Sequence, residues 1–446
     1  MSIIAVLGLG YVGLPLALAF CRSLASKQVL PWQHAQHQQV LPWQHAPVQQ
    51  VFGFDIDAAR VNTLNQGSDA NGEVDTLELQ AALAAGLTLS CDEQVLATAS
   101  IYIVTVPTPV NSDKRPDLAP LEAACRLIAK FLKRGNLVVF ESTVYPGCTE
   151  EFCAPLLSEG SGLKLNEDYV LGYSPERINP GDQVHQLASI VKITSGSTAA
   201  AADQVDALYS SIITAGTFRA ASIRTAEAAK VIENVQRDVN IALVNEFAQV
   251  CAHLKLDSAA VLAAARSKWN FLDFRPGLVG GHCIGVDPYY LIYRAQSLGY
   301  HPALISTARL VNEGMVGHIC AEVLKLCARR GLAANGAKVL ILGVAFKENC
   351  SDTRNSRVFD IAAELKSFGA EVALYDPVVA RAHGDIVNGM HLITPTPGSF
   401  DLALIAVAHR QFAELGAAGI RALLKPNGLI YDVKRLLATA DSDGHL

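Results

Sequence analysis

The sequence predicts an α/β protein with two Rossmann-like doubly wound domains, joined by a helical middle domain with one long central helix. An apolar run at the N-terminus leads into a glycine-rich turn and an apolar helical pattern. A helical pattern free of Gly and Pro covers residues 225–254, and short apolar runs separated by helical patterns return after about residue 331. We therefore expect a dinucleotide-binding domain at 1–205, a central helical domain at 206–320 and a second nucleotide-binding domain at 321–446.

Composition excludes several classes of protein. The 446 residues are half hydrophobic and carry a formal net charge of -6, which argues against a nucleic-acid binder and against a polybasic membrane anchor. The 10 Cys show no Cys-x-x-Cys pair and no zinc-like spacing, which favours reduced thiols, no metal site and a cytoplasmic location. The chain enters an apolar run at Ile3 without a basic leader, and no apolar run reaches membrane-spanning length. We expect neither a signal peptide nor a membrane span.

The first element has the pattern of a dinucleotide site. The apolar run Ile3-Ile4-Ala5-Val6-Leu7 suits a buried parallel strand, and an apolar helical pattern covers residues 14–24. The turn between them is Gly8-Leu9-Gly10-Tyr11-Val12-Gly13. This order of strand, glycine turn and helix is typical of a site that binds a pyrophosphate at a helix N-terminus.

The second strand, Val51-Phe52-Gly53-Phe54, ends in Asp55. An acid there would bind the ribose hydroxyls and repel a 2′-phosphate, which selects NAD over NADP. Asp55 lies about twice the usual distance from the glycines because a repeat intervenes. Gln28–Gln38 and Gln39–Gln49 are identical at nine of eleven positions. The repeat connects a helix to a strand, so we expect it at the strand edge opposite the cofactor. We expect a solvated loop and no metal site, because its His residues have no Cys or acid beside them.

Three later apolar runs are each followed by polar residues. The runs cover residues 101–106, 137–140 and 169–173, and the polar residues that follow them include Thr108, Thr143 and Glu176. Ligands of open α/β sheets gather at the carboxyl ends of the strands, so these three residues are candidate site residues. For each of these residues alone, ordinary loop or helix-cap chemistry is an equally good interpretation.

The long helical pattern places Lys230 and Asn234 four residues apart, hence on one face. A lysine and an amide together can stabilise a developing alkoxide. For this pair alone a solvated polar face is the better interpretation. A helix of this length often links domains or forms a dimer interface.

The stretch Gly280-Gly281-His282-Cys283-Ile284-Gly285-Val286-Asp287-Pro288 carries the strongest sign of chemistry. Two glycines without Cβ atoms would let the backbone pass close to a ligand. The single Cys and the carboxylate four residues later suit a thiol nucleophile with a nearby acid. The alternative is a buried structural Cys in a loop.

After residue 331 four apolar runs, at 338–343, 372–375, 402–407 and 429–431, predict a second sheet. The turn after its first strand contains one glycine where the first domain has three. The tail after Ala438 is polar, and we expect it to be frayed.

Taken together, these motifs resemble the UDP-glucose/GDP-mannose dehydrogenase family from end to end. The motifs that carry the resemblance come in family order: Gly8 to Pro15, Glu141-Ser142-Thr143, Lys230 with Asn234, Gly280 to Asp287, and Gly343-Val344-Ala345-Phe346-Lys347. Within the family, Gly280 to Tyr290 and Ser174 to Gly181 resemble the bacterial branch that oxidises UDP-N-acetylhexosamines for surface polysaccharides such as Vi antigen and O-antigen. The repeat departs from the family pattern.

The resemblance implies roles for individual residues. Cys283 would be the nucleophile, Lys230 and Asn234 would stabilise oxyanions, Asp287 would support a water or take a proton, and Glu176 with Thr143 would handle the hydrolytic water. NAD would be bound by Gly8, Gly10, Tyr11, Val12, Gly13, Asp55, Arg60, Thr108, Thr143 and Arg354. The UDP-sugar would be bound by Lys230, Asn234, Gly281 and Lys347. The resemblance also implies a UDP-sugar-binding C-terminal domain and a homodimer formed through the long helix.

Chemistry agrees with these roles, because oxidation of a primary alcohol to an acid removes two hydrides. A thiol can hold the intermediate aldehyde as a thiohemiacetal, whose oxidation gives a thioester that water cleaves. The substrate would be UDP-GlcNAc or UDP-GalNAc, with UDP-glucose or UDP-ManNAc as alternatives, and no residue reports which hydroxyl configuration is bound.

Two other classes of protein remain as alternatives. A two-electron dehydrogenase of the hydroxyacid type also places Lys and Asn four apart on a helix, but it needs neither Cys283 nor a second nucleotide domain. An inactive NAD-binding redox sensor would not need the complete set of candidate catalytic residues, which are Cys283, Lys230, Asn234, Asp287 and Glu176. The number of NADH molecules formed per substrate distinguishes these classes.

Overall fold

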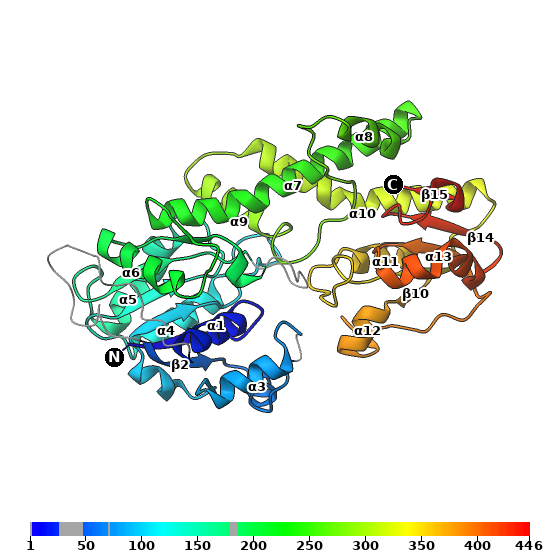
Figure 1. Ribbon diagram of the computed structural model, residues 1–446. Helices are drawn as coiled ribbons and strands as arrows, with labels where there is room; N and C mark the ends of the chain where they lie inside the picture. Colours follow the sequence, from blue (N-terminus) through cyan, green and yellow to red (C-terminus); the bar gives the residue numbers. More distant parts are fainter. Residues whose placement is uncertain (1, 26–47, 70–71, 178–185) are drawn as a thin grey trace. The chain divides into compact units, whose positions relative to one another are not determined.

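The computed structural model describes residues 2–25, 48–69, 72–177 and 186–446 (Figure 1). The chain forms two compact units, the first made of residues 1–232 and 289–298, the second of residues 233–288 and 299–446. Most of the repeat, residues 28–47, lies outside the described residues.

The first unit contains a six-stranded parallel sheet in the order β3-β2-β1-β4-β5-β6. The strands are β1 Ser2–Leu7, β2 Val48–Phe54, β3 Thr88–Ser90, β4 Ile101–Val104, β5 Leu137–Phe140 and β6 Val170–Tyr173. The strand order reverses between β1 and β4, and a crevice for a ligand forms outside the carboxyl ends of strands at such a point. The predicted doubly wound fold is confirmed.

Helices cover both faces of this sheet, as the strand order requires (Figure 1). They are α1 Gly13–Ala25, α2 Ala58–Asn65, α3 Thr76–Ala84, α4 Ala119–Ala129, α5 Ala154–Ser161 and α6 Ala199–Ser210. A separate parallel pair of strands consists of β7 Lys192–Thr194 and β8 Thr217–Arg219, and short helical turns cover Glu93–Thr98, Thr149–Cys153 and Leu187–Ser189. Ile4, Val6, Leu14 and Leu18 are among the buried side chains that join β1 to α1 in one core.

The predicted long helix is α7, Ile223–Leu254, with 32 residues. It is followed by α8 Ser258–Arg266, α9 Asp287–Ser297 and α10 Ala303–Arg329, a second long helix that the apolar pattern did not reveal. In the second unit Arg309 on α10 forms a buried ion pair of 2.6 Å with Asp238 on α7, and Asn312 donates to the same carboxylate. These buried contacts connect α10 to α7 within the second unit.

The second unit contains a parallel sheet in the order β10-β9-β13-β14-β15. The strands are β9 Lys338–Leu342, β10 Glu371–Tyr375, β13 Phe400–Ile405, β14 Leu424–Asp432 and β15 Gly444–His445, and a small antiparallel pair consists of β11 Ile386–Val387 and β12 Met390–His391. The helices are α11 Val358–Ser367, α12 Pro377–His383 and α13 Arg410–Leu423, with a short helical turn at Thr439–Asp441. The four strands expected from the apolar runs are all present, and the single glycine of the first turn, Gly343, has a φ of 87°.

The expectation of a frayed tail is wrong. Gly444 and His445 pair with Tyr431 and Asp432 of β14, so the tail adds a fifth strand to the sheet. The Asp443 carboxylate accepts a hydrogen bond from the backbone amide of Ile430 and pairs with arginines, and Leu446 is buried. Polar composition alone predicted fraying, whereas partners elsewhere in the sheet fix the tail.

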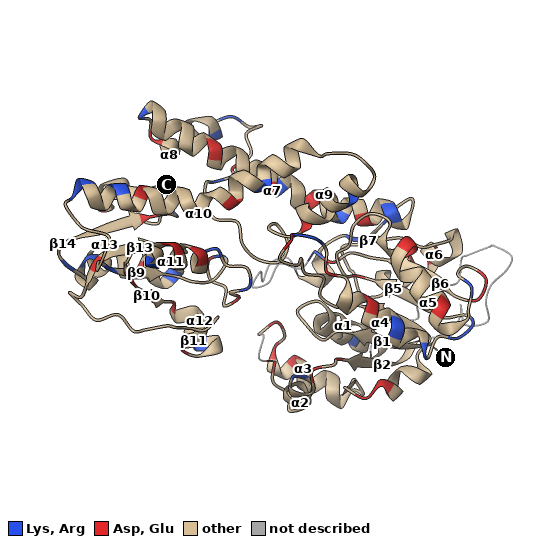
Figure 2. Ribbon diagram, turned by 180° about the vertical axis from the view of Figure 1, so that it is seen from behind, with Lys and Arg blue, Asp and Glu red and all other residues tan. Residues whose placement is uncertain are grey.

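Charges of both signs are distributed along the helices of the described residues (Figure 2). An anionic ligand is therefore expected to depend on local cations. Within the same residues, no helix has both the length and the hydropathy required to cross a bilayer.

Candidate active site

The glycine turn after β1 leaves room for a dinucleotide. Gly8 has a φ of 94°, a conformation that favours glycine. A Cβ on Gly13 would lie 1.8 Å from the Gly8 carbonyl oxygen and 2.4 Å from Thr105 Oγ1, so no side chain fits at the first residue of α1. A Cβ on Gly10 would meet no described atom within 4 Å, which leaves space in front of the helix N-terminus. These residues fit the pyrophosphate of NAD.

Asp55 directly follows β2 and is tied to the glycine turn. Its Oδ2 accepts a hydrogen bond of 2.7 Å from the backbone amide of Leu9, and its Oδ1 accepts from the amide of Asp57. The Arg60 guanidinium donates to the Leu9 carbonyl and pairs with Asp69. Arg60, which the resemblance assigns to NAD, therefore contacts the turn itself, while Tyr11 and Val12 lie half-buried within the turn.

Two of the expected threonines lie next to each other in the first unit. Thr108 Oγ1 donates a hydrogen bond of 2.7 Å to the backbone carbonyl of Thr143, and both side chains are half-buried. Tyr290 on α9 donates its hydroxyl to the carbonyl of Thr108. The loops after β4 and β5 are thus connected at the carboxyl edge of the sheet, where the sequence placed them.

Glu176 lies in a buried polar cluster of the first unit. Its Oε2 contacts Nζ of Lys192 at 2.5 Å, and the same Nζ lies 2.7 Å from Oε2 of Glu141. The Tyr209 hydroxyl donates to the other oxygen of Glu141. Lys230 on α7 donates a hydrogen bond of 2.6 Å to the backbone carbonyl of Glu176. The structure therefore brings together Glu176 and Lys230, which lie 54 positions apart in the sequence.

The second unit brings together Asn234 and Asp287. The Asn234 amide donates a hydrogen bond of 2.5 Å to Oδ2 of Asp287, and both side chains are buried. The backbone carbonyl of Cys283 accepts hydrogen bonds from the amides of Val286 and Asp287, which forms a turn directly before α9. The side chain of Cys283 is half-buried, as access by a substrate requires.

The two glycines before Cys283 have a structural reason that the sequence did not reveal. A Cβ on Gly280 would lie 2.8 Å from the Asn355 carbonyl oxygen, and one on Gly281 would lie 2.8 Å from the Phe346 ring. Both glycines therefore allow the Cys283 loop to pack against the loop that follows β9. Close approach to the protein's own backbone and ring explains them without a ligand.

His282, beside the candidate nucleophile, is neutral at physiological pH. Burial and the nearby Arg354 lower its pKa to about 4, although Asp352 opposes this shift. An imidazolium at this position is therefore not a source of charge for a thiolate at pH 7.

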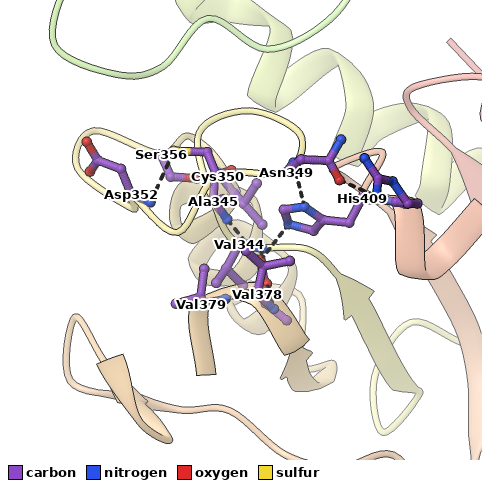
Figure 3. A network of polar contacts seen from close by, with 12 residues as sticks. Val344, Ala345, Asn349, Cys350, Asp352, Ser356, Val378, Val379 and His409 are labelled. Carbon is purple, nitrogen blue, oxygen red and sulfur yellow. Dashed lines mark hydrogen bonds and ion pairs between the residues drawn. The ribbon is translucent and has the colours of Figure 1, made fainter. Parts of the chain in front are cut away.

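The loop after β9, residues 343–356, is held by a polar network that includes Val344, Ala345, Asn349 and His409 (Figure 3). Oδ2 of Asp376 accepts from the amides of Val344 and Ala345 and lies 3.0 Å from Nε2 of His409. Nδ1 of His409 accepts a hydrogen bond from the amide of Asn349, so Nε2 carries the proton toward Asp376. His409 and Asp376 are completely buried. Burial alone would raise the pKa of the Asp376 carboxyl, but its contact with His409 and the hydrogen bonds from backbone amides keep this pKa below its usual value.

This loop carries the two remaining candidates. Lys347 Nζ lies 5.5 Å from the centre of the Phe346 ring, and its side chain lines a small cavity together with Gly280 and Lys434. Arg354 forms an ion pair with Asp352 within the loop.

Sequence patterns missed several residues of these networks. Glu141 lies at a strand end, two residues before Thr143. This position could have marked it as a candidate, but any acid at a strand end would share that signal. Lys192, Tyr209 and His409 lie in or near ordinary apolar patterns, and their partners come from distant segments.

Three consecutive segments match the three domains of one protein family. Residues 44–213 match the NAD binding domain, 224–314 the central domain and 340–439 the UDP binding domain of the UDP-glucose/GDP-mannose dehydrogenase family.

Curated relatives match over almost the whole chain. The UDP-N-acetyl-D-glucosamine 6-dehydrogenase of Pseudomonas aeruginosa is 48% identical over 441 residues, covering 99% of this chain and 98% of that protein. The protein of the same name from Salmonella typhi is 46% identical over 444 residues, with coverage of 99% and 98%. Among solved structures, the UDP-D-ManNAc dehydrogenase of Pyrococcus horikoshii superposes with a TM-score of 0.84 at 29% identity, over 98% of this chain and 96% of that one. The chain therefore belongs to the UDP-glucose/GDP-mannose dehydrogenase family of NAD-dependent nucleotide-sugar dehydrogenases.

Proposed function

We propose that this enzyme oxidises the 6-hydroxymethyl group of a UDP-N-acetylhexosamine, UDP-GlcNAc first, to the uronic acid. The observation that carries the proposal is the 48% and 46% identity, over nearly full length, to two UDP-N-acetyl-D-glucosamine 6-dehydrogenases. The product would enter the biosynthesis of a surface polysaccharide.

Cys283 is the proposed nucleophile. Bound NAD supplies the hydride acceptor for each of two successive oxidations. The Cys283 thiolate adds to the intermediate aldehyde, which then stays attached as a thiohemiacetal until the second oxidation gives a thioester. Lys230 and the Asn234 amide stabilise the oxyanion of each tetrahedral state, and Asp287 orients Asn234 through their hydrogen bond.

Glu176, with Thr143, is proposed to act in thioester hydrolysis. The water attacks the thioester carbonyl and gives a proton to Glu176, while Cys283 leaves as the thiolate. The hydrogen bond from Lys230 to the Glu176 backbone carbonyl supports this role, because it connects a residue of the oxidation step to one of the hydrolysis step.

Binding roles follow the same division. Gly8, Gly10, Tyr11, Val12, Gly13, Asp55, Arg60, Thr108, Thr143 and Arg354 are proposed to bind NAD. Gly281 and Lys347 are proposed to bind the UDP-sugar with Lys230 and Asn234. We also propose the three-domain division at 1–205, 206–320 and 321–446.

A homodimer through α7 is proposed as the assembly. Leu243, Val250 and Leu254 are exposed apolar residues at helical spacing on α7, and Leu310 on α10 is 70% exposed. A stripe of exposed apolar residues along one face of a helix is typical of an interface between subunits. A cytoplasmic location is proposed from the ten cysteines, all of them described, none of which forms a disulfide.

The test is a panel of UDP-GlcNAc, UDP-GalNAc, UDP-ManNAc and UDP-glucose with NAD, with NADH counted per substrate consumed. Two NADH per uronic acid and highest kcat/KM for UDP-GlcNAc are expected. One NADH per substrate would favour a two-electron dehydrogenase, and a preference for UDP-glucose or UDP-ManNAc would reassign the substrate.

A further inference from the structure

A buried lysine bridges two buried glutamates at the carboxyl edge of the first sheet. Lys192 Nζ lies 2.7 Å from Glu141 Oε2 and 2.5 Å from Glu176 Oε2, and the three side chains are 3%, 0% and 6% exposed. Glu141 follows β5, Glu176 follows β6 and Lys192 begins β7. The two carboxylates thus come from the segments that follow two neighbouring parallel strands, and their shared cation comes from the separate pair of strands, β7 and β8.

Each glutamate of the cluster has a further hydrogen-bond partner besides Lys192. Glu141 accepts from the Tyr209 hydroxyl, and Glu176 Oε1 accepts from the backbone amide of Arg177. Burial raises the pKa of Glu141 despite Lys192. Burial opposes the charge of Lys192 too, yet the two carboxylates raise its pKa, so the ammonium is retained.

We propose that Lys192 is a positioning residue for thioester hydrolysis, which keeps Glu176 ionised and oriented while Glu141 and Tyr209 fix the ammonium between the two carboxylates. The inference rests on the hydrolytic role proposed for Glu176. In that step a water oxygen bonds to the thioester carbon, the carbon–sulfur bond breaks, the electron pair leaves with Cys283 and a water proton moves to Glu176. Glu176 accepts this proton only if it is ionised before the step.

The Lys192 ammonium offsets the repulsion between the two carboxylates, because it lies within ion-pair distance of both Glu141 and Glu176. Lys230 contacts the backbone carbonyl of Glu176. The Tyr209 hydroxyl is bonded to Glu141 and is neutral, because burial raises its pKa further. Without the ammonium, the two buried carboxylates would share one proton, as in a carboxylate pair.

The test compares Lys192→Met with Lys192→Arg. In Lys192→Met, we expect the burst of NADH formation to persist, hydrolysis at pH 7 to slow on the order of 100-fold, and a covalent adduct on Cys283 to accumulate in mass spectra. In a plot of the hydrolysis rate against pH, the fall of the rate on the acidic side should move to higher pH by at least about one unit. Structural damage alone would not produce this shift. Lys192→Arg retains the charge and should keep the pH profile of the wild type. Lys130→Met removes an exposed lysine paired with Glu93 and is the matched control, with wild-type kinetics expected.

Glu176→Gln separates this inference from the proposed function. If Glu176→Gln accumulates no adduct, the hydrolytic role of Glu176 is wrong. If Glu176→Gln accumulates the adduct but folded Lys192→Met hydrolyses with the wild-type rate and pH profile, the inference about Lys192 is overturned. Should Lys192→Met not fold, Glu141→Gln provides the answer, because it removes the competing charge and its amide keeps one acceptor oxygen for Lys192 or Tyr209. In this variant the fall of the rate on the acidic side should move to lower pH, and an unchanged profile would overturn the inference.

Discussion

Asn234 donates its side-chain amide to Oδ2 of Asp287, and the two residues are buried at 0% and 3% exposure. The hydrogen bond connects α7 to the first residue of α9, four positions after Cys283. It leaves one orientation for the Asn234 amide, with its donor directed to Asp287. The two residues should therefore act as one unit.

Asn234→Ala and Asp287→Ala should each lower kcat by about 100-fold or more, as loss of an oxyanion donor does elsewhere. The double variant should lose little beyond the worse single variant, because each residue depends on the other. Initial rates of NADH formation for the four proteins in this cycle, with circular dichroism to verify folding, measure the coupling. Multiplicative losses would show that the residues act independently.

Asp55 should determine the preference for NAD. Its carboxylate, which we propose binds the ribose, also accepts from the Leu9 amide, so Asp55→Ala would loosen the glycine turn as well. Asp55→Asn removes the charge but keeps one acceptor oxygen. We expect it to reduce the difference between the affinities for NAD and NADP, with less loss of stability than in Asp55→Ala. Dissociation constants for both cofactors measure this effect. A wild-type preference for NADP would show that the role of Asp55 is wrong.

Local patterns predicted what depends on local geometry. The strand before Gly8, the N-terminus of α1 and the acid after β2 form one continuous unit, so their spacing alone indicates the fold. The cluster around Lys192 cannot be predicted this way, because Glu141 and Glu176 come from two strands whose neighbours are fixed only by the sheet. Gly281 shows a third case: the absence of a Cβ was predicted to admit a ligand, and in the structure it also admits the Phe346 ring, which the sequence could not reveal.

Glu227 should make stability depend on pH. Its carboxylate accepts from the amides of Gly147 and Thr149 and is completely buried, and burial raises its pKa to about 7. The folded state then holds this proton between pH 4.5 and 7 while the unfolded state releases it. The free energy of unfolding should therefore fall as pH rises through that window, by at most about 1.4 kcal/mol per unit from this group. Urea denaturation across the window measures the slope, which Glu227→Gln should reduce. An identical slope in the variant would assign the pH dependence to other groups.

His409 should control the position of the loop that carries Lys347. His409→Ala removes the acceptor for the Asn349 amide and the partner of Asp376. We expect about tenfold weaker binding of UDP, the equivalent of about 1.4 kcal/mol, and a smaller loss of NAD affinity, because Arg354 of the same loop is proposed to bind NAD. Isothermal titration with each ligand tests this, and His391→Ala, an exposed histidine on β12, is the control. Equal UDP affinity in folded His409→Ala would mean that the loop does not depend on the network.

Deletion of one copy of the repeat should leave the enzyme active. The structure changes which copy to remove, because β2 begins at Val48, inside the second copy, and Val48 pairs with Ser2 at the start of β1. Deleting Gln39–Gln49 would remove two residues of this strand, whereas deleting Gln28–Gln38 keeps them. The segment enters the sheet at the amino end of β2, and Gly8 and Asp55 lie at the carboxyl ends of β1 and β2.

Loop-closure entropy grows slowly with length, so the eleven-residue difference should change stability by less than about 1 kcal/mol. We expect the deletion of Gln28–Gln38 to leave kcat and NAD affinity within about twofold of the wild type. Deletion of Gln39–Gln49 should cost more stability, because His37 would replace Val48 in the strand. Thermal unfolding and steady-state kinetics of both deletions test this order. A folded Gln28–Gln38 deletion with a large loss of activity would mean that the repeat contacts the active-site rim or a second copy of the chain, and the assignment to the opposite edge would be abandoned.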